Sequence, residues 1–173
     1  NSLVEKEQAV KSSWAQVENV YQRRADLIPN LVQTVKGYAS HESETLEEVT
    51  ASRSRVGSIQ VTPEILNNPA QFQKFQQAQS GLSSALTRLM VVVERYPDLK
   101  ANENFRDLQN QLEGTENRIS HERKNFNDAS QIYNTSVNKF PGKIYARIFG
   151  FQEKPYFQAA AGSEKAPVVD FSK

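Results

Sequence analysis

Apolar side chains recur along residues 3–38 at intervals that fit the repeat of an α-helix. This spacing places them on one face of a helix, where they can pack against other helices. The members of this apolar stripe are Leu3, Val10, Trp14, Val17, Tyr21, Ile28, Leu31, Val35 and Tyr38. So long a stripe needs partners of comparable length to cover it, and it therefore predicts a helical bundle.

Pro29 lies within this stripe, although proline lacks an amide hydrogen and crowds the carbonyl group four residues earlier. In a helix interior these two effects cost roughly 3 kcal/mol. Ile28 and Leu31 nevertheless stay in phase on either side of it. The pattern favours one kinked helix from Leu3 to about Ala39. The alternative is a helix-reversing turn at Pro29, which would give two antiparallel helices in its place.

Further amphipathic helices are expected at about residues 46–57, 69–96 and 102–139, followed by a short helix at 143–149. Asn68 as the N-cap and Pro69 in the first turn begin the third helix, and Pro97 stops it. The inner faces carry Leu46, Val49 and Val56, then Phe72, Phe75, Leu82, Leu86, Leu89, Val93 and Tyr96, and finally Phe105, Leu108, Leu112, Ile119, Phe126, Ala129, Tyr133 and Val137. The predicted fold class is all-α, a four-helix up-and-down bundle of long amphipathic helices with a short C-terminal helix.

The bundle domain is expected to comprise residues 1–157, with residues 158–173 as an extended C-terminal tail. The segment from Gln152 onward contains Pro155 and no helical periodicity, so an extended path is expected there. Within this segment, Tyr156 and Phe157 are the side chains that need to pack against the bundle.

The composition excludes several classes of function. The chain has 21 Lys and Arg against 20 Asp and Glu, a net charge of +1, and the basic residues alternate with acids instead of forming a stripe. Binding to nucleic acid is therefore not expected. The absence of cysteine rules out disulfides, thiolate metal sites and a cysteine nucleophile. The longest apolar run, Leu89–Val93, is far shorter than the ~20 residues that span a bilayer.

The sequence offers no convincing catalytic, cofactor-binding or metal-binding set, and we expect none. His41 and His121 are each followed by glutamate, but neither has the second histidine of a helical zinc motif. Glu113 and Glu116 share a helix face, as acids that pair with Lys or Arg commonly do. No Glu-x-x-His pair, glycine-rich phosphate loop or nucleophile elbow is present.

Two residues inside predicted helices need an explanation. Arg24 falls on the apolar stripe, where an unpaired buried charge would be costly. A buried ion pair with Glu94, Glu113 or Glu116 is the favoured explanation, and an anion site for a ligand or partner is the alternative. Gly114 is unfavourable in a helix interior by about 1 kcal/mol relative to alanine. We expect another helix to approach closely there.

Several long motifs resemble the bacterial LemA family of envelope proteins. They are QRRADLIPNLV at 22–32, VKGYA at 35–39 with His41-Glu42, VERYPDLKAN at 93–102 and QLEGTENRI at 111–119. The resemblance extends from the first helix through Phe157. It implies an N-terminal transmembrane helix or lipoprotein-like signal followed by a helical-bundle domain. It implies no enzymatic activity, cofactor or catalytic residue.

These observations together predict a non-enzymatic, soluble domain of a membrane-anchored envelope protein that acts through contacts with an unknown protein. We expect attachment to the membrane through an apolar segment upstream of Asn1, as a single-pass or lipid anchor, or else a periplasmic location. Ser2 and Glu5 have the spacing of a capping box, so the first helix either begins there or continues from upstream. The alternatives for function are a sensor of small molecules or peptides and an unrecognised metal-dependent hydrolase.

Overall fold

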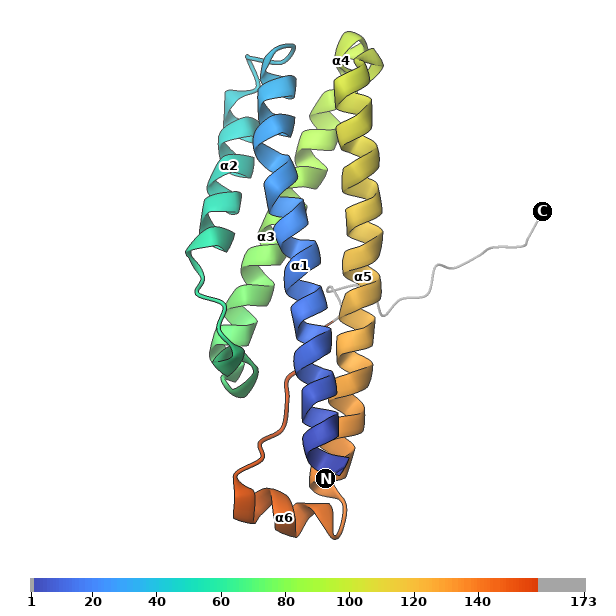
Figure 1. Cartoon of the computed structure of the whole chain (residues 1–173). Coiled ribbons are helices and arrows are strands. Elements are labelled where there is room, and N and C mark those ends of the chain that lie inside the picture. Colours follow the sequence, from blue (N-terminus) through green and yellow to red (C-terminus); the bar gives the residue numbers. More distant parts are fainter. Residues whose placement is uncertain (1, 159–173) are drawn as a thin grey trace, which may run out of the picture.

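A computed structural model describes residues 2–158, which form helices joined by short connections, with no β-strand among them. The long helices run alternately up and down (Figure 1), so the predicted all-α up-and-down bundle is confirmed. The elements are α1 (Ser2–Lys36), α2 (Ser43–Ser58), the 3-10 helix η1 (Pro63–Asn67), α3 (Pro69–Val93), α4 (Pro97–Ala101), α5 (Glu103–Asn138) and α6 (Gly142–Phe149). No helix within residues 2–158 is both long and apolar enough to cross a bilayer.

The first helix is continuous, so the kinked helix was the correct alternative at Pro29. Pro29 is exposed within α1, and all members of the apolar stripe from Leu3 to Val35 are buried. Tyr38 is an error of the prediction, because it is 43% exposed. Since α1 ends at Lys36, the residues beyond it leave the helical register, and Ala39 takes the buried position instead.

Pro29 also creates a link between α1 and α2. The carbonyl group that a residue at position 29 would bond within the helix belongs to Ala25. This carbonyl oxygen accepts a hydrogen bond from Nε of Arg53 on α2 at 2.9 Å. The bond that proline cannot make is thus replaced by one that joins two helices.

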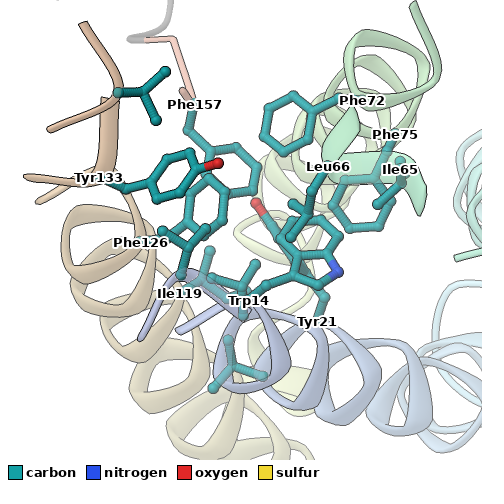
Figure 2. Packing of buried hydrophobic residues seen from close by; sticks show 14 of the residues in the cluster. Trp14, Tyr21, Ile65, Leu66, Phe72, Phe75, Ile119, Phe126, Tyr133 and Phe157 are labelled. Atoms are coloured by element: carbon teal, nitrogen blue, oxygen red, sulfur yellow. The ribbon is translucent and has the colours of Figure 1, made fainter. Parts of the chain in front are cut away.

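The core is divided into two apolar clusters along the bundle. The aromatic cluster lies at the end where α1 starts, and its central rings are Trp14, Phe72, Phe126 and Phe157 (Figure 2). The ring centroid of Trp14 lies 5.5 Å from that of Phe126 and 5.6 Å from that of Phe72. The second cluster is aliphatic in α1 and α3, and it extends from Ile28 to the opposite end of the bundle.

Two boundaries and one glycine differ from the sequence predictions. Helix α3 ends at Val93 instead of Tyr96, and Pro97 does not simply stop a helix but begins α4, which buries Leu99. Gly114 is exposed, and a Cβ atom there would meet nothing within 4 Å. The expected close approach of another helix at Gly114 is therefore wrong, and the structure gives no reason for glycine at this position.

After α6 the chain turns at Gly150, which adopts a left-handed conformation with φ of 74°, and returns along the bundle in an extended path. Phe157 packs into the aromatic cluster as expected, whereas Tyr156 is 43% exposed. Lys154, which the sequence did not single out, is buried. The predicted tail at 158–173 lies outside the described residues except for Gln158.

The link at Pro29 predicts coupling between two substitutions. Arg53→Leu should destabilise the parent by about 1 kcal/mol, because the carbonyl of Ala25 loses a charged donor. In a Pro29→Ala background the restored amide can bond the same carbonyl, so the cost of Arg53→Leu should fall to less than half. Urea unfolding of the four proteins in a double-mutant cycle measures this coupling. The exposed Arg55→Leu is the control. Equal costs of Arg53→Leu in both backgrounds would show that the two groups are independent.

Candidate functional site

Arg24 is a charged residue that is almost completely buried, at 1% exposure. One terminal nitrogen, Nη1, donates to Oγ of Ser83 at 2.6 Å and to Oε1 of Glu116 at 3.0 Å. The other, Nη2, donates to the backbone oxygen of Gln79 at 3.0 Å and to its side-chain Oε1 at 2.7 Å. The guanidinium carbon also lies 5.2 Å from the ring centroid of Tyr21. The expected pairing of Arg24 with an acid on another helix is confirmed, and the acid is Glu116.

These contacts join three helices at one level of the bundle. Arg24 belongs to α1, Gln79 and Ser83 to α3, and Glu116 to α5. Helix periodicity explains the convergence, because Gln79 and Ser83 are four residues apart and so occupy one face of α3. Both terminal nitrogens of Arg24 are engaged by protein groups, which favours a structural role over the alternative of an anion site.

A groove of about 560 Å³ lies between α3 and α5, next to this polar cluster. The closest backbone packing in the bundle is between α1 and α5 and between α2 and α3, so the side formed by α3 and α5 is less closed. In Figure 1, α3 runs obliquely behind α1. The groove is lined by Ser83, Leu86, Thr87 and Met90 from α3 and by Gln109, Leu112, Glu113, Glu116 and Asn117 from α5.

A second buried cation, Lys154, lies in the other half of the molecule. Its Nζ is 3.1 Å from Oε1 of Glu7, donates to Oδ1 of Asn67 at 2.7 Å, and lies 5.3 Å from the ring centroid of Tyr133. Burial, with a smaller contribution from the charge of Glu7, raises the pKa of Tyr133 to about 12. The ring of Tyr133 therefore stays neutral beside this ion pair at physiological pH.

Two asparagines on α5 hold the returning segment by its backbone. Asn134 accepts the amide hydrogen of Lys154 at 2.7 Å and donates to the carbonyl oxygen of the same residue at 2.8 Å. Asn127 does the same with Phe157, at 2.8 and 3.0 Å. The two asparagines are seven residues apart, which places them on the same face of α5. We call this pair the asparagine clamps.

The two histidines are placed apart and contribute to no candidate metal centre. His41 is exposed in the turn between α1 and α2, whereas His121 lies on α5 with its Nε2 atom 3.2 Å from Nδ2 of Asn125. Among residues 2–158, no three His, Asp or Glu side chains are grouped closely enough to bind a metal ion.

Comparison with known proteins places this arrangement in a family. The model of the LemA family matches residues 13–171. The chain belongs to the LemA family. Magnetosome protein MamQ of Magnetospirillum gryphiswaldense is 28% identical over 97% of this chain and 66% of its own length. Magnetosome protein MamQ 1 of Paramagnetospirillum magneticum is 27% identical over 98% of this chain and 68% of its own length. Protein LemA of Metamycoplasma hominis is 22% identical over 92% of this chain and 69% of its own length.

The motifs that carry the LemA resemblance meet in the structure. The block at 22–32 contains Arg24, and the block at 111–119 contains its partner Glu116. The block at 93–102 forms the connection through α4, where Tyr96 donates to Oε1 of Glu42 at 3.1 Å. The asparagine clamps and Lys154 lie outside these blocks. The only hint of the clamps in the sequence is the series of asparagines along the α5 segment. Asparagine is so common on exposed surfaces that this series does not predict a binding role.

The Arg24 cluster predicts a large loss of stability on truncation. Arg24→Ala should cost on the order of 3 kcal/mol in the free energy of unfolding, because the buried Gln79 loses its donor and Glu116 its cation. The exposed neighbour Arg23→Ala is the matched control and should change stability by less than about 0.5 kcal/mol. Urea unfolding of both variants measures the difference. Similar stability of the Arg24→Ala variant and the parent would contradict the structural role.

Removing one asparagine clamp should expose to hydrogen exchange the backbone amide that it binds. Asn134→Ala should cost about 2 kcal/mol, because the buried backbone N–H and C=O groups of Lys154 both lose their partners. Hydrogen exchange should show faster exchange of the Lys154 amide, with little change at α2, whose buried apolar side chains belong to the second cluster. Gln131→Ala, an exposed amide on the same helix, is the control. Unchanged exchange at Lys154 would show that the clamp does not hold the segment.

Proposed function

We propose that this chain is the water-facing, non-catalytic domain of a membrane-anchored envelope protein, and that it binds a helical segment of a partner protein in the groove between α3 and α5. The observation that carries the proposal is the groove itself. It lies along the side formed by α3 and α5, where the described helices pack less closely than α1 packs with α5. Helices of partner proteins are commonly bound in such grooves through their apolar face.

The groove combines an apolar floor with a polar rim. Leu86, Leu112 and the half-buried Met90 supply the floor. Methionine suits such a surface because its flexible thioether adapts to different partner side chains. The rim on the α5 side is supplied by the half-buried Gln109 and by the exposed Glu113 and Asn117. A floor and rim of this kind resemble the anatomy of protein interfaces.

The charge of the groove indicates the chemistry of the partner. Glu113 and Glu116 both line it, and no basic side chain does. Arg24 lies in the bundle core and compensates part of the charge of Glu116, whereas Glu113 is exposed on the same side of α5. We therefore expect a partner helix with apolar residues at helical spacing and lysine or arginine beside them.

The polar groups inside the bundle support a structural role over a catalytic one. Both buried cations, Arg24 and Lys154, have acid partners on other elements, Glu116 and Glu7. Their hydrogen bonds are used to join helices and to hold the returning segment. The membrane attachment is supported by the LemA resemblance, which implies an N-terminal transmembrane helix or lipoprotein-like signal.

Site-directed photocrosslinking tests the proposal. The natural full-length protein is produced in its own cells with a photoreactive amino acid at Thr87, which lines the groove. Membranes are washed with alkaline carbonate, illuminated and analysed for crosslinked products. We expect the protein to stay with the washed membranes and to form one defined crosslinked product.

Charge substitutions at the rim show whether the crosslinked partner is bound in the groove. Gln109→Arg combined with Asn117→Arg should lower the crosslinking yield at least about tenfold, because the rim becomes positive toward a basic partner. Gln131→Arg, on the same helix but outside the groove, should leave the yield unchanged. A yield that responds equally to both would contradict binding in the groove. Recovery only in the soluble fraction would contradict the membrane attachment.

A further inference from the structure

Helix α6 presents an unusual number of apolar side chains to solvent. Ala146 is its only buried residue, whereas Ile144 and Tyr145 are more than half exposed. Ile148 and Phe149 are each 68% exposed, and Phe140 in the preceding turn is 82% exposed. We call these five side chains the α6 patch: Phe140, Ile144, Tyr145, Ile148 and Phe149. A continuous apolar patch of this kind on a water-exposed protein commonly marks an interaction site.

The patch is exposed to solvent at the end of the bundle, and two of its members, Phe140 and Tyr145, also line a cavity beside the start of α1. Ile144 and Ile148 are four residues apart, as are Tyr145 and Phe149, so the four side chains form two adjacent rows on one face of α6. Ala146 lies on the opposite face, which contacts the bundle. Gly142 explains how α6 can start so close to α5, because a Cβ atom there would lie only 2.0 Å from the backbone oxygen of Ser136.

Positive charge surrounds the α6 patch. Lys139, Lys143 and Arg147 are exposed, and the sequence from Ala129 to Gln152 contains these three cations and no acid. None of the three forms an ion pair with the described part of the chain. This concentration stands out in a chain whose net charge is only +1. An apolar face bordered by lysine and arginine is the pattern of helices that lie in the interface of an anionic membrane.

The position of α6 suits contact with a flat surface. Figure 1 shows α6 lying across the end of the bundle, roughly at right angles to the long helices and beside the start of α1. A cavity of about 560 Å³ between them is lined by Ser2 and Leu3 of α1 together with Gly142 and Tyr145 of α6. The patch thus lies at the outermost end of the molecule, where the long helices do not shield it.

We propose that the α6 patch is a second membrane contact, which inserts its apolar side chains among lipid tails while Lys139, Lys143 and Arg147 bind anionic lipid headgroups. This contact needs neither the groove nor an upstream anchor, so it goes beyond the function proposed above. In an anchored protein, it would fix the bundle upright on the bilayer, with α6 in the plane of the headgroups.

The charges argue for lipid over a second copy of the chain. A symmetric dimer through α6 would bring the three cations of both copies into one small interface, and the sequence from Ala129 to Gln152 holds no acid to offset them. A single helix of two turns also offers too little area for a stable dimer interface. An anionic bilayer satisfies both the apolar side chains and the cations that border them.

Vesicle cosedimentation of the chain comprising residues 1–173 tests the proposal. Vesicles of phosphatidylcholine alone are compared with vesicles of phosphatidylcholine and phosphatidylglycerol in about equal amounts. We expect binding to the anionic vesicles and little binding to the neutral ones, with the affinity falling as salt rises. Equal binding to both vesicles, or none to either, would overturn the proposal.

Matched variants identify the residues responsible. Ile148→Ser combined with Phe149→Ser should lower the affinity for anionic vesicles at least tenfold, and Lys143→Gln combined with Arg147→Gln should lower it by about fivefold for each cation. The controls are Val91→Ser, an apolar residue 65% exposed on α3, and Lys36→Gln, at the opposite end of the bundle. Controls that lose as much binding as the α6 variants would exclude this site. All these residues are exposed, and unchanged thermal midpoints verify folding.

A fluorescent label separates insertion from self-association. Because the chain has no cysteine, Ile148→Cys can carry one environment-sensitive dye, with Val91→Cys as the control. Anionic vesicles should shift the emission of the dye at position 148 to shorter wavelength and leave that at position 91 unchanged. Sedimentation without lipid should show a monomer. A dimer that the Ile148→Ser and Phe149→Ser pair abolishes, with no shift on vesicles, would assign the patch to a second copy instead.

Discussion

The bundle depends on one buried guanidinium group. Arg24 lies between the aromatic cluster, to which α1 contributes residues up to Tyr21, and the second cluster, which begins at Ile28. Aliphatic side chains of similar size tolerate a helix sliding by one turn, but a buried arginine does not, because it would lose its acceptors and strand a charge. The bonds to Gln79 and Glu116 therefore fix the register of three helices at once.

The groove is a consequence of the same arrangement. Ser83 and Glu116 bind Arg24 and also line the groove, so the point where α3 is held to α1 and α5 is the point where the groove begins. Beyond it, Met90 and Leu112 line the part of the groove that residues 2–158 leave open. A shift of α3 that broke the Arg24 bonds would change the shape of the groove as well, which links stability to binding.

Helical periodicity predicted the parts of the structure that depend on local pattern. It gave the continuous α1 through Pro29 and an acid partner for Arg24, since both follow from residues in phase on one face. It did not reveal Lys154, because the partners Glu7 and Asn67 are distant in the sequence and the segment around it has no period. The groove also escaped prediction, since it depends on the oblique path of α3, which no pattern within one helix encodes.

The asparagine clamps have a mechanical consequence. They grip the chain by its main-chain amides, one at Lys154 and one at Phe157, so each clamp opens separately when the segment is lifted away from α5. A pull at Gln158 directed away from the bundle would first break the bonds that Gln76 and Arg123 donate to its carbonyl oxygen, and would then load the clamps at Phe157 and Lys154 in turn. Because Phe157 is buried in the aromatic cluster and Nζ of Lys154 is bound to Glu7, helix α1 would already bear part of the load while the clamps hold. The end of the described chain thus resists being pulled away at several successive points, each of which is anchored in the bundle.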